Sequence, residues 1–248
     1  MDIVVCLKRT PDTAARIQIA ASGLAIDLAN VAFEIGPYDQ FALEEALRLK
    51  DAHGATVTVV SLGPTEVAKE LRDALSRGAD KAILLKADGS ATDAYGVAMA
   101  LADAVRPLNA DLVMFGYKAS DDDGAQVGSI VATKLGVPVV TEVTEIALSG
   151  RALTLVRESE GGQERVTCPL PAAITVHKTP HELRISNIKG IMAAKKKPLE
   201  ERAVTLAPPR VKIRHLAPPP ERKAGRKVEG ADAVAVTVRY LKDELKLL

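Results

Sequence analysis

The segment TVTVVSLGPTEVAKELRDALSRGADKAILL, residues 56–85, contains one complete strand–helix–strand unit. Residues 56–62 are rich in β-branched and apolar side chains, which is typical of a buried strand. After a Gly-Pro turn, residues 65–76 place apolar side chains at helical spacing, and Gly78 ends the helix. Residues 82–85 form a second short apolar run. Two strands joined by a helix in this way are expected to lie parallel in one sheet.

Three further strand–helix pairs have the same pattern. They are expected at residues 3–7 and 40–52, 82–85 and 92–105, and 112–115 and 124–135. In the first of these helices, Asp39 stands at the expected N-cap and Gly54 follows the end. Four such units in succession predict an α/β fold, with a doubly wound, mostly parallel sheet and helices on both of its faces.

The pattern changes after Pro138. Residues 144–148 and 153–157 flank a Ser-Gly-Arg turn and predict an added hairpin, and two more strands are expected at 165–168 and 172–176. This part of the chain therefore extends the sheet without adding further strand–helix units.

The C-terminal part is expected to leave the domain. Residues 207–220 contain five prolines, so this stretch is predicted to be extended, and residues 231–247 are predicted to form a helix. We therefore expect an α/β domain at residues 1–198, which includes a polar and then basic loop at 179–197. Residues 199–248 would form an extended arm whose helix packs on a partner protein.

Composition excludes several functional classes. Lys and Arg number 33 and Asp and Glu 32, so the net charge of +1 gives no reason to expect nucleic-acid binding. Aromatic residues make up only 3%, which predicts an aliphatic core. No apolar run is long enough for membrane insertion. Cys6 and Cys168 have neither metal-ligand spacing nor a disulfide pattern, and the chain opens on a strand-like run, so a cytoplasmic protein without a metal site is expected.

Open α/β sheets bind ligands where the strand order reverses, and the loops after the first and fourth strands would meet there if these two strands were neighbours. These two loops are therefore the candidate ligand site. The fourth-strand loop contains Asp121, Asp122 and Asp123, flanked by Gly116, Gly124 and Gly128. One interpretation is that the carboxylates cap the following helix. The other is that glycines and free N–H groups hold a phosphate there. The residues alone leave both open.

No catalytic centre is predicted. The sequence has no G-x-G-x-x-G dinucleotide motif, no phosphate-binding P-loop and no Ser/His/Asp elbow, and its four histidines fall in loops or at a helix end. Lys195, Lys196 and Lys197 follow an apolar run. They indicate either a solvated helix end or a cluster that steers an acidic partner.

Several segments, taken together and in order, resemble the β subunit of electron transfer flavoprotein, the ETF β or FixA family. These segments are VCLKR (5–9), PYD (37–39), EEALRLK (44–50), LGP (62–64), RGAD (77–80), DDDGAQVG (121–128), LPA (170–172) and GIMAAKKKP (190–198). The resemblance covers nearly the whole chain. It implies a Rossmann-like, adenine-nucleotide-binding fold and an electron-carrier subunit that has no catalytic residue of its own.

The resemblance further implies a heterodimer with an α subunit that holds most of the redox-active FAD, while the β subunit binds a structural AMP. The implied AMP-site residues are Cys6, Pro37, Tyr38, Asp39, Leu62, Gly116, Asp121, Asp122, Asp123, Gly124, Ala125, Gln126 and Val127. The N–H groups of residues 122–126 would donate to the phosphate, and Tyr38 would lie towards the flavin.

The family also implies a partner-binding loop. The implied residues are Ile188, Lys189, Ile191, Met192, Lys195, Lys196 and Lys197, with Ile188 as the apolar side chain that enters the partner. Glu158 matches a carboxylate that pairs with the α subunit. The implied electron donors are acyl-CoA dehydrogenase-type flavoenzymes, as in fatty acid oxidation, and the implied acceptor is a membrane quinone oxidoreductase. The loop at 180–184 departs from the family pattern, as do Gly36 and Thr13.

Two alternatives are open. An electron-bifurcating branch of the family carries a second FAD in place of AMP, and it tends to have Gly at the position of Asp122, so the three aspartates favour AMP. A stand-alone nucleotide-binding signalling protein of related fold is the other alternative, and the proline-rich arm argues against it.

Overall fold

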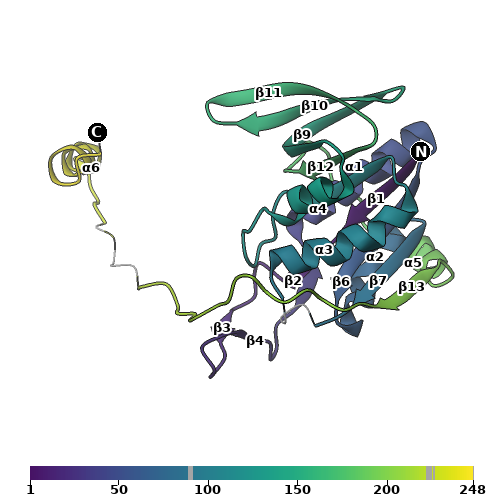
Figure 1. Cartoon of the computed structure of the whole chain (residues 1–248). Helices are drawn as coiled ribbons and strands as arrows, with labels where there is room; N and C mark the ends of the chain where they lie inside the picture. The colour runs from purple at the N-terminus through teal and green to yellow at the C-terminus, as the bar shows by residue number, and fades with distance from the viewer. Residues whose placement is uncertain (89–91, 222–224, 226, 248) are drawn as a thin grey trace.

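The computed structural model describes residues 1–88, 92–221, 225 and 227–247. A nine-stranded sheet runs through its body, in the order β11-β10-β9-β12-β8-β1-β6-β7-β13. Figure 1 shows helices on both faces of this sheet and a C-terminal segment that extends away from it. The α/β class predicted from the sequence, with a mostly parallel sheet, is confirmed.

The centre of the sheet is parallel. Its strands are β1 (Asp2–Cys6), β6 (Thr56–Gly63), β7 (Lys81–Lys86), β8 (Leu112–Gly116) and β12 (Ala172–Val176). Strand β1 pairs with β6 on one side and with β8 on the other. From β1 the chain first fills the sheet towards β7 and then towards β12, so the strand order reverses between β1 and β8.

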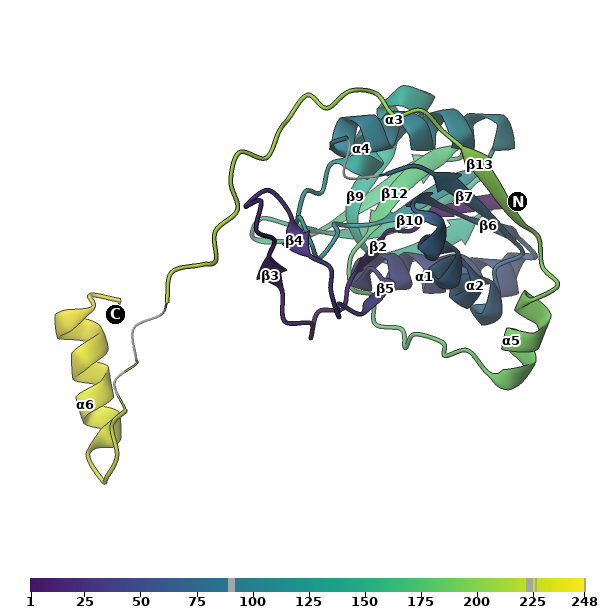
Figure 2. The same cartoon turned by 90° about the horizontal axis from the view of Figure 1, so that it is seen from below.

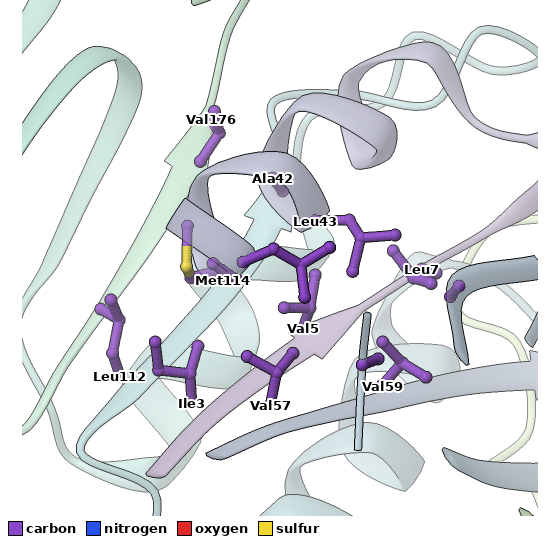
Figure 3. Close-up of a cluster of buried hydrophobic side chains, with 14 of the residues drawn as sticks. Ile3, Val5, Leu7, Ala42, Leu43, Val57, Val59, Leu112, Met114 and Val176 are labelled. Atoms are coloured by element: carbon purple, nitrogen blue, oxygen red, sulfur yellow. The ribbon is translucent and has the colours of Figure 1, made fainter. Parts of the chain in front are cut away.

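Two helices cover each face. Helices α1 (Pro37–His53) and α2 (Ala68–Arg77) pack on one face, and α3 (Ala94–Val105) and α4 (Val127–Leu135) on the other (Figure 2). Strand β1 shows why the strands are so apolar. Ile3 and Val5 pack under α1, while Val4 and Cys6 pack under the opposite layer. Figure 3 shows the first of these clusters, in which Leu43 of α1 lies over Val5 and Met114. A strand buried on both faces cannot alternate with polar residues.

Helices α1 and α4 begin at residues other than the predicted ones. Helix α1 begins at Pro37, with Gly36 at the N-cap, and α4 begins at Val127, with Gln126 at the N-cap. Asp39 is therefore inside the first turn of α1 and is not the N-cap. Proline favours the first helical position because its fixed φ already suits the helix and its missing N–H is not needed there.

An antiparallel extension completes one side of the sheet. Strands β9 (Val139–Ser149) and β10 (Ala152–Ser159) form the predicted hairpin, and β11 (Gly162–Pro169) adds to its outer edge. Strand β12 lies between β8 and β9, parallel to both. On the N-terminal side, two small antiparallel pairs were not predicted: β2 (Arg9–Pro11) with β5 (Phe33–Ile35), and β3 (Gln18–Ile19) with β4 (Ile26–Asp27).

The arm begins later than expected. Leu199–Ala203 forms β13, which pairs parallel with β7 as the ninth strand of the sheet. Its sequence LEERA gave no strand signal because it is an edge strand with mostly exposed residues. The chain stays attached beyond β13. The N–H groups of Arg210 and Val211 donate to the Asp93 carboxylate, and the N–H of Leu216 donates to the Gly23 carbonyl.

The terminal helix stands apart from the body in Figures 1 and 2. It comprises α6 (Ala233–Arg239) and a π-helical turn (Tyr240–Glu244), neither with a buried residue. It is shorter than the predicted helix at 231–247. No helix in the described part of the chain has the length and apolar character needed to cross a membrane.

Candidate functional site

The predicted meeting of two loops is confirmed. Strands β1 and β8 are neighbours, so their carboxyl ends lead side by side into Lys8 and into Tyr117. This is the position where the order of the parallel strands reverses, and loops that diverge there leave room for a ligand. The residues expected to bind a nucleotide are distributed around this edge.

A buried carboxylate links the two loops. Asp39, in the first turn of α1, accepts the Lys8 N–H at 2.7 Å and the Gly116 N–H at 2.8 Å, one with each oxygen. Its side chain is buried, and burial raises the pKa of this carboxyl to about 7, although both N–H donors oppose the shift. Asp39 therefore positions the site by fixing the ends of β1 and β8 against α1.

Gly116 is required by this link. A Cβ atom built there would lie 2.4 Å from Asp39 Oδ1 and 2.6 Å from the Asp39 nitrogen. Gly128 has a similar internal reason, since its Cβ would lie 2.7 Å from the Thr175 methyl group where α4 meets the sheet. The interpretation that all three loop glycines serve ligand approach is therefore replaced, for these two, by close packing within the protein.

The three aspartates are paired with lysines. Lys8 Nζ lies 2.7 Å from Asp121 Oδ1 and 3.0 Å from Asp122 Oδ2, and Lys118 Nζ lies 2.9 Å from Asp123 Oδ2. Asp122 also accepts the Gly124 N–H at 2.9 Å. None of them caps α4, which begins only at Val127. The carboxylates instead shape the loop, and the two lysines offset two of their three negative charges.

The backbone after the aspartates presents donors. Asp123 and Ala125 each have φ of 49°, whereas Gln126 has φ of −107° and ψ of −36°. Alternation of this kind turns successive N–H groups towards one point, which makes an anion-binding concavity. Among the described residues, the N–H groups of Ala125 and Gln126 have no acceptor, whereas Asp123 N–H donates to the Ala119 carbonyl. Of the five expected phosphate donors at 122–126, those of Asp123 and Gly124 are thus already used.

Sequence reasoning missed an aromatic cluster beside this loop. The rings of Tyr38, Tyr117 and His177 lie with centroids 5.1 to 5.7 Å apart. Tyr38 comes from α1, Tyr117 from the end of β8 and His177 from the end of β12. No local pattern joins three residues so distant in the sequence. Only the strand order β12-β8-β1, with α1 above, brings them together.

The other expected nucleotide-site residues lie at the base of this edge. Cys6 is the last residue of β1 and Leu62 the last but one of β6, and both pack into the core under α3 and α4. Pro37 and Val127 begin α1 and α4. Burial raises the pKa of the Cys6 thiol well above its usual range, so the thiol is neutral and unreactive. Cys6 contributes packing to the site and no chemistry.

The apolar side chains of the expected partner-binding loop are exposed to solvent. Helix α5 (Ile188–Ala194) carries Ile188, 82% exposed, with Ile191 and Met192 also exposed. Lys189, Lys195 and Lys196 are exposed beside them. Lys197 is different from its neighbours, because its ammonium donates to the carbonyls of Leu75 at 2.9 Å and Ala79 at 2.6 Å. It caps the end of α2, so the expectation that it faces a partner does not fit the structure.

Glu158 lies near the tip of the β10–β11 hairpin, where Gln163 donates to its carboxylate at 3.2 Å. Among the residues that the structure describes, no group of three or more His, Cys, Asp or Glu side chains is placed to hold a metal ion.

Comparison with known proteins gives one consistent result. The electron transfer flavoprotein domain matches residues 23–207 of the chain. A protein of Syntrophomonas wolfei named electron transfer flavoprotein subunit beta is 36% identical, over 100% of this chain and 98% of its own.

Two further relatives agree. The Bacillus subtilis protein of the same name is 34% identical over the full length of both chains. Protein FixA of Azorhizobium caulinodans is 41% identical over 78% of this chain and 70% of its own.

Proposed function

Since the chain belongs to the electron transfer flavoprotein β-subunit (FixA) family, we propose that it forms a heterodimer with an α subunit and binds AMP at the carboxyl ends of β1 and β8. The FAD that carries electrons would be held mainly by the α subunit. This chain would supply a rigid platform and a docking surface, without a catalytic residue of its own.

The observation that supports AMP is the pair of N–H groups at Ala125 and Gln126. They lack acceptors within the described chain and stand at the positive end of the α4 dipole. A phosphate there would also be near Lys8 and Lys118, whose ammonium groups already offset two of the three aspartate charges. The adenosine would lie along Pro37, Tyr38 and the aromatic cluster.

A second FAD in this position is the alternative. Asp122 argues against it, because its carboxylate holds both Lys8 and the Gly124 N–H, and the loop depends on that side chain. A branch with Gly at this position would need a different loop. The stand-alone signalling protein is a weaker alternative, since the family consists of subunits and the terminal helix has no buried residue of its own.

Mass spectrometry of the nucleotide released from the purified heterodimer tests the proposal, together with a count of flavin per heterodimer. One AMP and one flavin are expected. Two flavins and no AMP would establish the alternative.

A matched pair of variants at Ala125 localises the nucleotide. Ala125→Gly keeps the positive φ and should retain AMP. Ala125→Val opposes that φ through its branched Cβ and should lower AMP occupancy at least about tenfold. Equal AMP in both variants would place the nucleotide elsewhere.

We further propose that α5 docks electron donors, of the acyl-CoA dehydrogenase type, with Ile188 as its central apolar contact and Lys189, Lys195 and Lys196 facing acidic groups. The electrons would pass on to a quinone oxidoreductase in a cytoplasmic setting.

Glu158 and the terminal helix would contact the α subunit. Ile188→Ala should slow electron uptake at limiting donor without changing flavin content, and an unchanged rate would remove α5 from the docking surface.

A further inference from the structure

The segment of residues 181–192 turns several polar side chains towards the protein, while its isoleucines are exposed to solvent. Ile185 is 88% exposed and Ile188 82%, whereas Arg184 and Ser186 are half-buried against α1 and α2. Residues 181–187 form no helix or strand. An irregular segment that exposes isoleucines must be held by contacts other than its own backbone or a hydrophobic core.

The strongest of these contacts is made by Arg184. Its guanidinium forms a fork with the Glu44 carboxylate of α1, with Nε 2.9 Å from Oε2 and Nη2 3.0 Å from Oε1. The Arg184 N–H donates to the same carboxylate at 3.0 Å, and Nη2 also reaches Asp51 at 3.1 Å. Glu44 is only 5% exposed, and among the described residues the hydrogen bonds to its carboxylate all come from Arg184.

Three smaller contacts also join the segment to helices α1 and α2. His181 Nδ1 lies 2.7 Å from Oε1 of buried Glu45, and Ser186 Oγ donates to Asp73 Oδ1 at 2.8 Å. Gly190 lets α5 approach α2, because a Cβ atom there would lie 2.3 Å from the Ser76 carbonyl oxygen. These contacts fix the segment at four points along its length.

We propose that Glu44 and Arg184 are positioning residues for docking, and that Ile185 is a second apolar contact with the electron donor. The inference rests on the docking role of α5 proposed above. Burying the Glu44 and Glu45 carboxylates is costly unless hydrogen-bond partners meet them, and here the partners, Arg184 and His181, both belong to the segment. The pair therefore orders the isoleucines before the donor arrives, which removes an entropic cost from binding.

Hydrogen exchange of the intact heterodimer tests the positioning step. Arg184→Lys keeps the charge and loses the fork. Amides of residues 181–192 should exchange at least about tenfold faster than in the wild type, with α1 unchanged. Arg202→Lys is the matched control, because Arg202 makes a similar fork with Glu200 on β13, away from the segment. Unchanged exchange in Arg184→Lys, or an equal increase throughout α1, would overturn the proposal.

Steady-state transfer from an acyl-CoA dehydrogenase, used as donor with its acyl-CoA substrate, tests the consequence. Arg184→Lys and Ile185→Ala should each raise the KM for the heterodimer several-fold and leave kcat unchanged, whereas Arg202→Lys should change neither. If Ile188→Ala raises KM but Arg184→Lys and Ile185→Ala do not, the positioning inference is wrong and docking stands. If Ile188→Ala has no effect either, the docking function itself is wrong.

Discussion

Helix α1 uses buried carboxylates in two ways. In its first turn, Asp39 meets only the neutral N–H groups of Lys8 and Gly116. Five residues further on, Glu44 meets the charged fork of Arg184, and that contact raises the pKa of the guanidinium. The first arrangement joins parts of the sheet that must not move, and the second attaches an exposed segment. The comparison shows that α1 uses a charged partner, Arg184, for the segment that no hydrophobic core holds in place, and uses neutral N–H groups where the core already fixes the strands.

The largest effect is expected from a substitution that breaks the hydrogen bond between Asp39 and Gly116. Gly116→Ala would place a methyl group within 2.4 Å of Asp39 Oδ1, so the end of β8 must separate from α1. We expect a loss of about 3 kcal/mol in the free energy of unfolding and loss of bound nucleotide. Urea denaturation measures the first. Gly162→Ala, with nothing within 4 Å of the new Cβ, is the control and should change stability little.

A pH series sharpens the same comparison. The folded pKa of Asp39 is about 7 against an ordinary value of 3.8. Between these values the unfolded chain loses this proton and the folded chain keeps it, so stability falls as pH rises through the window. Relative to Asp39→Asn, the wild type should lose about 2 kcal/mol between pH 5 and pH 8. Parallel curves for the two proteins would show that Asp39 is ionised throughout.

Removing the charged partner breaks the Glu44 arrangement. Arg184→Met leaves a buried carboxylate without its fork. Because Arg184 is partly open to solvent, we expect a loss of about 1.5 kcal/mol, well below that for a fully buried pair. Thermal unfolding should show this cost, and a double variant with Glu44→Gln should recover part of it. An additive double variant would mean that the two side chains do not interact.

The smallest effect concerns the lysine at the phosphate loop. Lys8→Met removes two partly exposed ion pairs, so stability should change by less than about 1 kcal/mol. Nucleotide affinity should fall several-fold, because Asp121 and Asp122 would then face the phosphate unpaired. Isothermal titration with AMP would separate the two quantities. A large stability loss with unchanged affinity would assign Lys8 to the fold alone.

The sequence predicted those features that depend on local periodicity. The four strand–helix units and the hairpin have regular apolar patterns. That the first and fourth strands are neighbours was only a condition of the predicted site, and the fold supplies it. Strand β13 was missed because the edge of a sheet does not require apolar residues. The loop of three aspartates was located, but its pairing with Lys8 was not, because that contact spans more than a hundred residues.

The same limit applies to the site. That Asp39 bridges Lys8 and Gly116 could not be read from its position before a helix, where a capping role was the simpler interpretation. The cluster of Tyr38, Tyr117 and His177 has no signal in the sequence. Both depend on which strands are neighbours, and this is fixed only by the fold as a whole.

The anchoring of the arm sets a limit on how the chain captures another subunit. Among the described residues, the last backbone hydrogen bond to the body is that of Leu216, and α6 begins at Ala233. At about 3.3 Å per residue, this tether spans at most roughly 55 Å. Because the tether is this short, α6 is present at an effective concentration of about a millimolar near the α/β domain of its own chain. Weak binding of a second subunit by α6 alone would therefore suffice to keep that subunit close to the α/β domain while the larger interface forms.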